Sequence, residues 1–172
     1  MEIERKFTIT SLPDNLLSYP CHIIEQAYLN TDPVVRIRRQ DDSYYLTYKG
    51  KGLLAREEYN LPLNEESYYH LREKADGNII SKKRYVIPIT NPKFDTTYAS
   101  LDKENIDQIS LSVELDIFEA PFAPLIIAEV EFPDKEMAEA FLPLDWFSQD
   151  VTNDPAYHNS NLSTRSGGFT NH

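Results

Sequence analysis

The first strand-like stretch of the chain, residues 2–7, carries residue types that could do chemistry. It reads Glu-Ile-Glu-Arg-Lys-Phe. Because successive side chains of an extended strand point to opposite faces, Glu2, Glu4 and Lys6 share one face of it. Two carboxylates beside an ammonium group suit a hard divalent cation and the phosphate that such a cation carries. A solvated edge strand would look the same, so the interpretation depends on whether the pattern recurs.

Basic residues return at alternate positions in several later segments. Arg36 and Arg38 alternate with Val35 and Ile37, so both guanidinium groups project from the same face of a strand. The planar donors of arginine suit phosphate oxygens, and the ammonium groups of lysine add compact positive charges. Seven basic side chains occupy positions of this kind: Lys6, Arg36, Arg38, Lys49, Arg56, Lys82 and Arg84.

Acidic residues follow the same alternation. Glu114 and Asp116 face away from the aliphatic residues of their segment, and Glu129 and Glu131 do so in the next one. Carboxylate oxygens are the ligands that hard divalent cations prefer. Seven acidic side chains form this second set: Glu2, Glu4, Glu58, Glu114, Asp116, Glu129 and Glu131.

The net charge of −11 hides an uneven distribution. Residues 1–84 carry 13 basic and 13 acidic side chains, whereas residues 85–172 carry only 4 basic against 15 acidic ones. If both halves line one cavity, the first can receive an anion and the second can supply metal ligands. The alternative is that the acidic half has only a well-solvated surface. The overall negative charge argues against a protein that binds nucleic-acid polymers.

Alternating strands and a few short helices account for most of the chain. The best helical segment begins after Asn64, an N-cap residue, and ends before Gly77. Residues 90–109 have no clean period, so we expect an insertion there, with a helical turn near residues 103–109. Strands are expected at residues 2–7, 22–30, 34–40, 44–49, 53–63, 79–88, 111–118 and 125–132. A short helix or turn is expected at residues 13–19, a short helix at 135–142, and a short C-terminal helix that starts at Pro155 and contains Tyr157 and Leu162.

Two folds would bury the apolar faces of such strands. In a sandwich the charged faces point to water, but a sandwich does not need seven cations and seven anions at alternating positions. In a barrel the charged faces line the lumen, and closure leaves no strand edge exposed. Because buried like charges are costly unless they are paired, a polyanion with divalent cations is the natural occupant. We therefore predict an α+β fold: a closed or nearly closed eight-stranded antiparallel β-barrel with helices packed outside.

The length of the chain fits one domain, which we place at residues 1–163, followed by a tail at 164–172 that is expected to be disordered. The chain begins without the apolar run of a signal peptide and has no stretch of about eighteen apolar residues. Cys21 is the single cysteine, so neither a disulfide framework nor a zinc site is predicted. We expect a cytoplasmic protein that binds no membrane, and both a monomer and a homodimer fit the sequence.

The order of these motifs resembles that of the CYTH superfamily, the triphosphate tunnel metalloenzymes. The opening residues match the Glu-x-Glu-x-Lys signature of that superfamily, and the later charged pairs follow in the same order. Gln26, Tyr28 and Thr47 are further matches, as is the C-terminal segment from Trp146 to Leu162. The resemblance covers residues up to about 163, and it implies that the last helix plugs one end of the tunnel.

The resemblance also implies an activity: metal-dependent hydrolysis of a triphosphate, foremost inorganic tripolyphosphate, by attack of water on the terminal phosphorus. The basic set would bind phosphate oxygens, and the acidic set would hold two Mg²⁺ or Mn²⁺ ions. Lys6, Glu58 and Lys82 are the candidates for catalytic side chains, and no general base is assigned. The metal ligands divide into Glu2, Glu4, Glu129 and Glu131 for one ion and Glu58, Glu114 and Asp116 for the other.

Other activities fit the same tunnel. An adenylate cyclase or a thiamine triphosphatase would hold its organic group at the mouth, and a catalytically silent module would only bind polyphosphate. Two positions depart from the pattern of the superfamily. Asn60 stands where many members carry a second glutamate, which could weaken a metal site, and Ala156 stands where a basic residue is frequent, which could loosen the hold of the plug on phosphate.

Overall fold

The computed structural model describes residues 1–98 and 103–164 of the chain. Its strands form a single antiparallel sheet in the order β10-β1-β9-β8-β7-β2-β3-β4-β6, and β5 pairs with β1. The strands are β1 (Glu2–Ile9), β2 (Cys21–Thr31), β3 (Val34–Gln40), β4 (Ser43–Lys49), β5 (Ala55–Arg56), β6 (Glu58–Leu63), β7 (Asp76–Pro88), β8 (Ser112–Phe118), β9 (Ile126–Glu131) and β10 (Phe147–Asp150).

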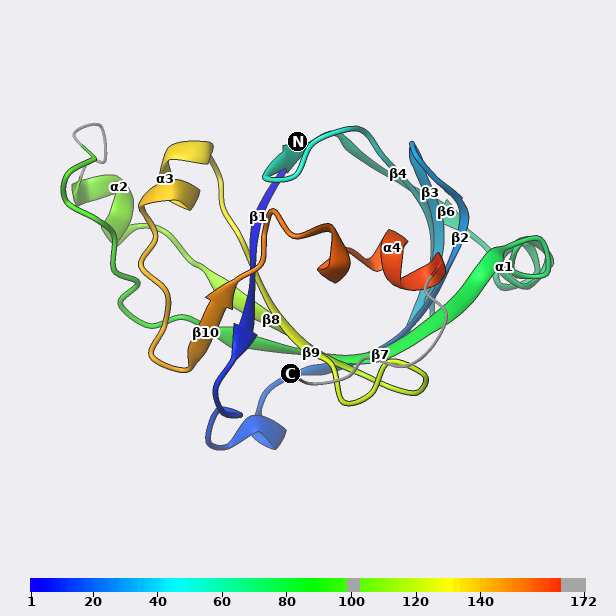
Figure 1. The fold of residues 1–172 in the computed structure, drawn as a ribbon, viewed down its shortest axis with the longest axis horizontal. Helices are drawn as coiled ribbons and strands as arrows, with labels where there is room; N and C mark the ends of the chain where they lie inside the picture. Colours follow the sequence, from blue (N-terminus) through cyan, green and yellow to red (C-terminus); the bar gives the residue numbers. More distant parts are fainter. Residues whose placement is uncertain (99–102, 165–172) are drawn as a thin grey trace.

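The sheet curls into a nearly closed barrel, which confirms the predicted fold (Figure 1). Closure takes place at β5, where Arg56 pairs with Glu2 and Ala55 with Ile3. The expected strand 53–63 is therefore two strands, because the chain changes its pairing partner from β1 to β4 at Glu57. The side chains alternate on both sides of this break, so their periodicity did not reveal it.

Three helices lie outside the ring of strands in Figure 1: α1 (Glu65–Arg72), α2 (Lys103–Asp107) and α3 (Lys135–Ala140). The backbone N–H of Ser67 donates to the Asn64 side chain at 2.7 Å, so the expected N-cap of α1 is confirmed. Strand β7 begins three residues earlier than expected, which places Gly77 inside the strand. The segment expected at 13–19 forms a 3₁₀ helix, Leu16–Ser18.

The outer faces of the strands are covered as their apolar residues predict. Tyr68 of α1 is fully buried against Ala27 and Ile37. On the other side of the barrel, Phe7 of β1 stacks on Phe147 of β10, with their ring centroids 4.6 Å apart. The sequence analysis missed β10, which has four residues and pairs only with β1. Within the described ranges, no helix is long and apolar enough to cross a membrane.

The C-terminal segment enters the barrel (Figure 1). The expected helix 155–162 is divided into a 3₁₀ helix, Pro155–Tyr157, and α4 (Asn159–Thr164). Leu162 of α4 is fully buried among lumen-facing apolar side chains that include Ile80 and Phe118. The lumen therefore has an apolar floor beneath α4. Thr164, the first residue of the expected tail, belongs to α4, and residues 165–172 lie outside the described part.

Gly77 is the one glycine that the plug requires. Its φ is +73°, and a Cβ built on it would lie 2.1 Å from the carbonyl oxygen of Ser163 in α4. We expect Gly77→Ala to lower the free energy of unfolding by at least about 1–2 kcal/mol, the cost of a left-handed backbone for alanine. Gly50→Ala is the matched control, because its Cβ would meet Glu57 at ordinary contact distances. Urea unfolding monitored by circular dichroism measures both, and equal effects would contradict a close contact between β7 and α4.

Candidate active site: a charged tunnel

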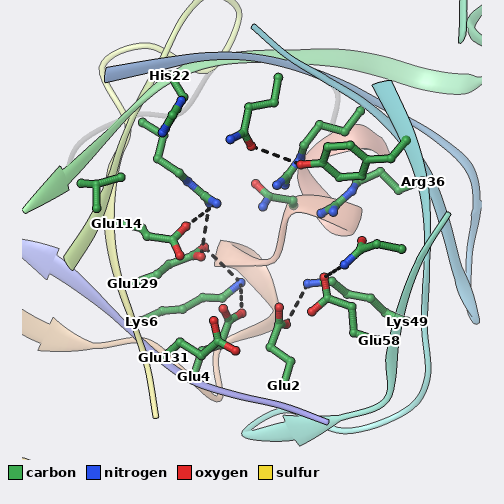
Figure 2. Close-up of a pocket in the computed structure, with 17 residues that line it drawn as sticks. Glu2, Glu4, Lys6, His22, Arg36, Lys49, Glu58, Glu114, Glu129 and Glu131 are labelled. Atoms are coloured by element: carbon green, nitrogen blue, oxygen red, sulfur yellow. Dashed lines mark hydrogen bonds and ion pairs between the residues drawn. The ribbon is translucent and has the colours of Figure 1, made fainter. Parts of the chain in front are cut away.

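The lumen above the apolar floor contains a cavity of about 400 Å³ whose walls are almost entirely polar (Figure 2). Most of the predicted site residues line it. The lining consists of Glu2, Glu4, Lys6, His22, Arg36, Arg38, Gln40, Tyr45, Lys49, Glu58, Asn60, Arg84, Val86, Glu114, Glu129, Glu131 and Asn159.

Three predicted site residues do not line the cavity: Arg56, Lys82 and Asp116. Arg56 belongs to the short closing strand β5, where it pairs with Glu2. Lys82 and Asp116 are completely buried, with 1% and 0% of their surface exposed. They face the lumen, but they lie deeper than the cavity and next to the apolar floor.

Cross-strand pairing explains which charges meet. In the register of β1 and β9, Lys6 lies opposite Glu129 and Glu4 lies opposite Glu131. Glu129 also lies opposite Glu114 on β8. Residues directly opposite each other on one face of a sheet have neighbouring side chains, and like charges in such pairs destabilise the sheet. Two of these three pairs are therefore unfavourable, and they put carboxylates side by side on one wall.

One side of the view in Figure 2 is occupied by the carboxylate wall, with Lys6 lying between its side chains. The wall consists of Glu2, Glu4, Glu114, Glu129 and Glu131. Burial, together with the charge of Glu129, raises the pKa of Glu4 from 4.5 to about 7. Burial and the charges of Glu2, Glu114 and Glu4 also raise the pKa of Glu131. The wall thus carries more negative charge than its own cations neutralise.

The chemistry of this wall fits a divalent cation. Its donors are carboxylate oxygens, and the raised pKa values of Glu4 and Glu131 reflect burial first and then repulsion between carboxylates, both of which a bound cation would offset. Among the described residues, no three His, Cys, Asp or Glu side chains are already gathered tightly enough to hold an ion. Side-chain rotation would therefore have to complete a ligand set.

A buried ion network lies between the carboxylate wall and the floor. Asp116 accepts two hydrogen bonds from Arg84, at 2.7 Å from Nε and 2.8 Å from Nη2, and its Oδ2 lies 2.7 Å from Nζ of Lys82. Arg84 also pairs with Glu114 and, at 3.4 Å, with Glu129. Despite burial, the charges of Arg84 and Lys82 hold the pKa of Asp116 well below its usual range. Burial lowers the pKa of Lys82 to about 7, and the nearby Arg84 and Arg38 add to this shift.

The opposite wall carries two buried arginines on β3. Nε and Nη2 of Arg38 both donate to Oε1 of Gln26, at 2.9 and 2.6 Å. Nη2 of Arg36 donates to Oγ1 of Thr47 at 3.2 Å, and its Nε is buried without a hydrogen-bond partner. In the described part of the chain, neither guanidinium forms an ion pair with a carboxylate. Burial, followed by the charges of Arg36 and Arg84, lowers the pKa of Arg38.

Polar residues of β4 and β6 connect the two walls. Nζ of Lys49 donates to Oε1 of Glu2 at 2.8 Å. Burial and a hydrogen bond with Glu58 raise the pKa of Glu2, whereas that same bond and the Lys49 charge lower the pKa of Glu58 despite its burial. Asn60 accepts a hydrogen bond from Thr47 at 2.6 Å and donates one to Glu58 at 3.3 Å.

The plug is fixed to the strand that carries Lys6. The backbone N–H of Lys6 donates to Oγ1 of Thr152 at 3.0 Å, and its carbonyl accepts from the N–H of Val151 at 2.8 Å. His158 is buried beside them, and burial together with the Lys6 charge lowers the pKa of its imidazole. Asn159, the first residue of α4, reaches the cavity lining.

Sequence reasoning assigned no site role to His22, Gln40, Tyr45 and Val86, although all four line the cavity. Each continues an alternation that was already recognised: Gln40 follows Arg38 by two residues, and Tyr45 precedes Thr47 by two. The two-residue alternation of the strands therefore already indicated that these positions face the lumen. Attention to charged residues alone left these positions out.

The comparisons with known proteins agree with this geometry. Residues 1–143 match the family model of the CYTH domain. An inorganic triphosphatase of Nitrosomonas europaea is 32% identical over 166 residues, which covers 94% of this chain and 96% of the relative. An inorganic triphosphatase of Acetivibrio thermocellus is 33% identical over 171 residues, with 94% and 92% covered.

Solved structures share the fold. The crystal structure of an inorganic triphosphatase superposes with a TM-score of 0.67 at 29% identity, covering 98% of this chain and 97% of the other. A Hippeastrum protein described as an adenylyl cyclase with a dominant triphosphatase activity superposes with a TM-score of 0.56 at 16% identity, covering 81% and 83%, which shows a common fold alone. With most of its length matched by the family model and by relatives more than 30% identical, the chain belongs to the CYTH domain family.

Proposed function

We propose that this protein hydrolyses a triphosphate, with inorganic tripolyphosphate as the preferred substrate. The observation that carries the proposal is that, within the described part of the chain, Arg36 and Arg38 are buried, form no ion pair and donate to neutral oxygens. Burying such cations is costly unless an anion compensates them. The names of the two relatives, both inorganic triphosphatases, support the same activity.

The two walls would share the work of binding. Arg36 and Arg38 would donate to phosphate oxygens from β3, and their planar guanidinium groups allow two hydrogen bonds to one phosphate. Lys6 and Lys49 stand among the carboxylates and would add point charges. Arg84 is already held by three carboxylates, so it would orient the carboxylate wall as well as contact phosphate.

Mg²⁺ or Mn²⁺ ions, two in number, would complete the site. Glu2, Glu4 and Glu131 are the carboxylates whose raised pKa values favour a cation, and Glu58, Glu114 and Glu129 are further candidate ligands. When bound, such an ion supplies positive charge that neutralises and polarises phosphate oxygens. Asp116 is fully engaged by Lys82 and Arg84, so we propose that it positions Arg84, although the sequence analysis assigned it as a metal ligand.

The reaction would be a direct displacement. The oxygen of a water molecule forms a bond to the terminal phosphorus, and the anhydride bond to the next phosphate breaks. Phosphate and pyrophosphate leave, and the two protons of the water pass to these products or to solvent. The contribution of the protein is to hold the substrate in line and to neutralise the charge that develops on the departing oxygen. Lys6 lies in the cavity between Glu4 and Glu129, where it can meet that charge.

Rival activities differ in what they release. Phosphate release from tripolyphosphate, ATP and thiamine triphosphate, each with Mg²⁺ or Mn²⁺ and with a chelator, tests the proposal. We expect fastest release from tripolyphosphate and none with chelator. Formation of cyclic AMP from ATP would identify a cyclase. Faster phosphate release from thiamine triphosphate than from tripolyphosphate would identify a thiamine triphosphatase, and binding of tripolyphosphate without phosphate release would identify a silent module.

A variant at Arg38 tests the guanidinium wall, the side of the lumen on which β3 carries Arg36 and Arg38. We expect Arg38→Ala to raise KM for tripolyphosphate about ten- to a hundredfold, because a hydrogen bond to a charged group contributes about 1.5–3 kcal/mol. Arg39→Ala is the matched control, since Arg39 points outward and donates to the Tyr69 hydroxyl at 3.0 Å. Steady-state phosphate release measures both variants. Equal KM values in the two variants would mean that β3 does not bind the substrate.

A variant at Glu4 tests the repulsion within the carboxylate wall. Its folded-state pKa of about 7 exceeds the ordinary 4.5, so the stability that protonated Glu4 provides is present below pH 4.5 and lost as the pH rises through 7. With chelator present, we expect Glu4→Gln to unfold at a higher temperature than wild type at pH 8 and at a similar temperature at pH 4.5. The same variant should lose metal-dependent turnover. A Glu4→Gln protein that is less stable at pH 8 would contradict the repulsion inferred for this wall.

Variants of Asp116 and Glu131 distinguish a structural role in the buried ion network from a role in metal binding. We expect Asp116→Asn to lose about 3–5 kcal/mol of stability, because it leaves two buried cations without their carboxylate. Glu131→Gln should keep its stability and need more Mg²⁺ for half-maximal activity. Urea unfolding and a Mg²⁺ titration of activity measure these effects. If Asp116→Asn were stable but required more Mg²⁺, then Asp116 would be a metal ligand, as its sequence pattern suggested.

A further inference from the structure

A histidine at the rim of the cavity has no part in the function described so far. His22 of β2 lines the cavity (Figure 2). Its Nδ1 lies 2.7 Å from Oδ2 of Asp41. Asp41 sits in the turn between β3 and β4, where its other oxygen accepts the backbone N–H of Ile23 at 2.9 Å. Its own N–H donates to the Ile23 carbonyl at 2.9 Å. The carboxylate is therefore held in place from both sides.

This arrangement fixes the imidazole. Hydrogen bonds from His22 and Ile23 hold the pKa of Asp41 below its usual range, so Asp41 is ionised and its carboxylate can only accept hydrogen bonds. Nδ1 of His22 therefore carries a proton and donates it to Asp41, and in the imidazolium form Nε2 is a second donor that can bind an anion. Within the described residues, Nε2 hydrogen-bonds to no protein group.

The position of His22 along the wall matches a chain of phosphates. Arg36, Arg38 and Gln40 follow one another along the lumen face of β3, and Gln40 pairs with Ile24, two residues from His22 on β2. The side chains from Arg36 to Gln40 span about 13 Å, at about 3.3 Å per residue. His22 stands at the outer end of this row, on the wall where Arg36 and Arg38 lack counterions.

The charged groups around His22 come from several elements. Asp41 holds it from the β3–β4 turn, Arg39 donates to the Asp41 carbonyl at 3.1 Å, and Arg84 is its register partner on β7. Glu114 of β8 lines the same cavity but is paired with Arg84. Among the described residues, Asp41 is the carboxylate that forms an ion pair with His22.

We propose that His22 binds the outermost phosphate of the polyphosphate substrate through Nε2, and that Asp41 is the positioning residue that orients it. The inference rests on the proposed function and adds a specificity residue at the mouth of the tunnel. In its imidazolium form His22 donates from Nε2 with a full positive charge, so substrate binding is expected to weaken as the pH rises.

The test compares His22→Gln and Asp41→Asn with the wild type between pH 6 and 8.5. We expect His22→Gln to raise KM for tripolyphosphate about five- to tenfold at pH 6.5, with kcat changed less than about twofold. The wild-type KM should rise with pH, and that of His22→Gln should stay flat. The KM of Asp41→Asn should lie between that of the wild type and that of His22→Gln. Both side chains are a third or more exposed, so the variants should unfold at the wild-type temperature.

His70→Gln on α1 is the matched control, because His70 is exposed outside the barrel. It should leave KM and its pH dependence unchanged. A His22→Gln protein whose KM profile equals that of His70→Gln would overturn the proposal.

Direct binding of tripolyphosphate, measured calorimetrically in chelator, separates this inference from the proposed function. If the wild type binds tripolyphosphate in chelator but releases no phosphate from it when Mg²⁺ or Mn²⁺ is supplied, and His22→Gln binds it more weakly, the role of His22 stands and the hydrolase proposal fails. If His22→Gln binds as tightly as the wild type, the role of His22 fails whatever the rate of hydrolysis. A wild type that neither binds nor hydrolyses tripolyphosphate would overturn both.

Discussion

Electrostatic imbalance inside a low-dielectric tunnel is the constraint on which the rest of this structure depends. One wall buries Arg36 and Arg38 without counterions, and the opposite wall places Glu4 beside Glu131 in direct cross-strand register. Each wall alone is unfavourable, because burial removes the water that would screen its charge. A polyanion with its cations would satisfy both walls at once. The arrangement is thus more stable when occupied, and the fold must hold it together when it is empty.

The barrel can hold these charges because each is fixed by a strand whose outer face is buried elsewhere. Phe7 follows Lys6 on β1 and packs against Phe147, while Ile37 lies between Arg36 and Arg38 and packs under α1. Moving a charged side chain out of the lumen would require a strand to slip by one residue, which would also expose its apolar face. The hydrophobic cover outside the barrel therefore stabilises the charged interior.

The alternation that places charges in the lumen is local, and for that reason it was readable from the sequence. It gave the strands, the barrel and most of the cavity lining. What it could not give are facts of long-range pairing. The change of partner at Glu57 leaves the period intact, and the brevity of β10 leaves no period to detect.

Depth within the tunnel is also hidden from the sequence. Lys82 and Arg84 look equivalent by spacing, yet Arg84 lines the cavity and Lys82 does not. Lys82 lies beside the apolar floor, with its Nζ 5.2 Å from the centroid of the Phe118 ring, and Phe118 belongs to the same buried cluster as Leu162 of the plug. For His22, spacing gave the face of the strand but not the role of the side chain. Its spacing from Gln26 marked the correct face, but only the position of Asp41 in three dimensions marks its imidazole as oriented.

Asn60 shows how a departure from the family pattern fits this balance. Its amide donates to Glu58 and accepts from Thr47, which in turn accepts from Arg36. A glutamate at this place would add a third carboxylate to Glu2 and Glu58, which already share a hydrogen bond and shift the pKa of each other. The neutral amide keeps the link to the guanidinium wall without that extra repulsion. The negative charge of this tunnel is thereby concentrated on β1, β8 and β9, opposite the arginines of β3, and on the proposed function this asymmetry would orient a substrate that carries its cations on one side.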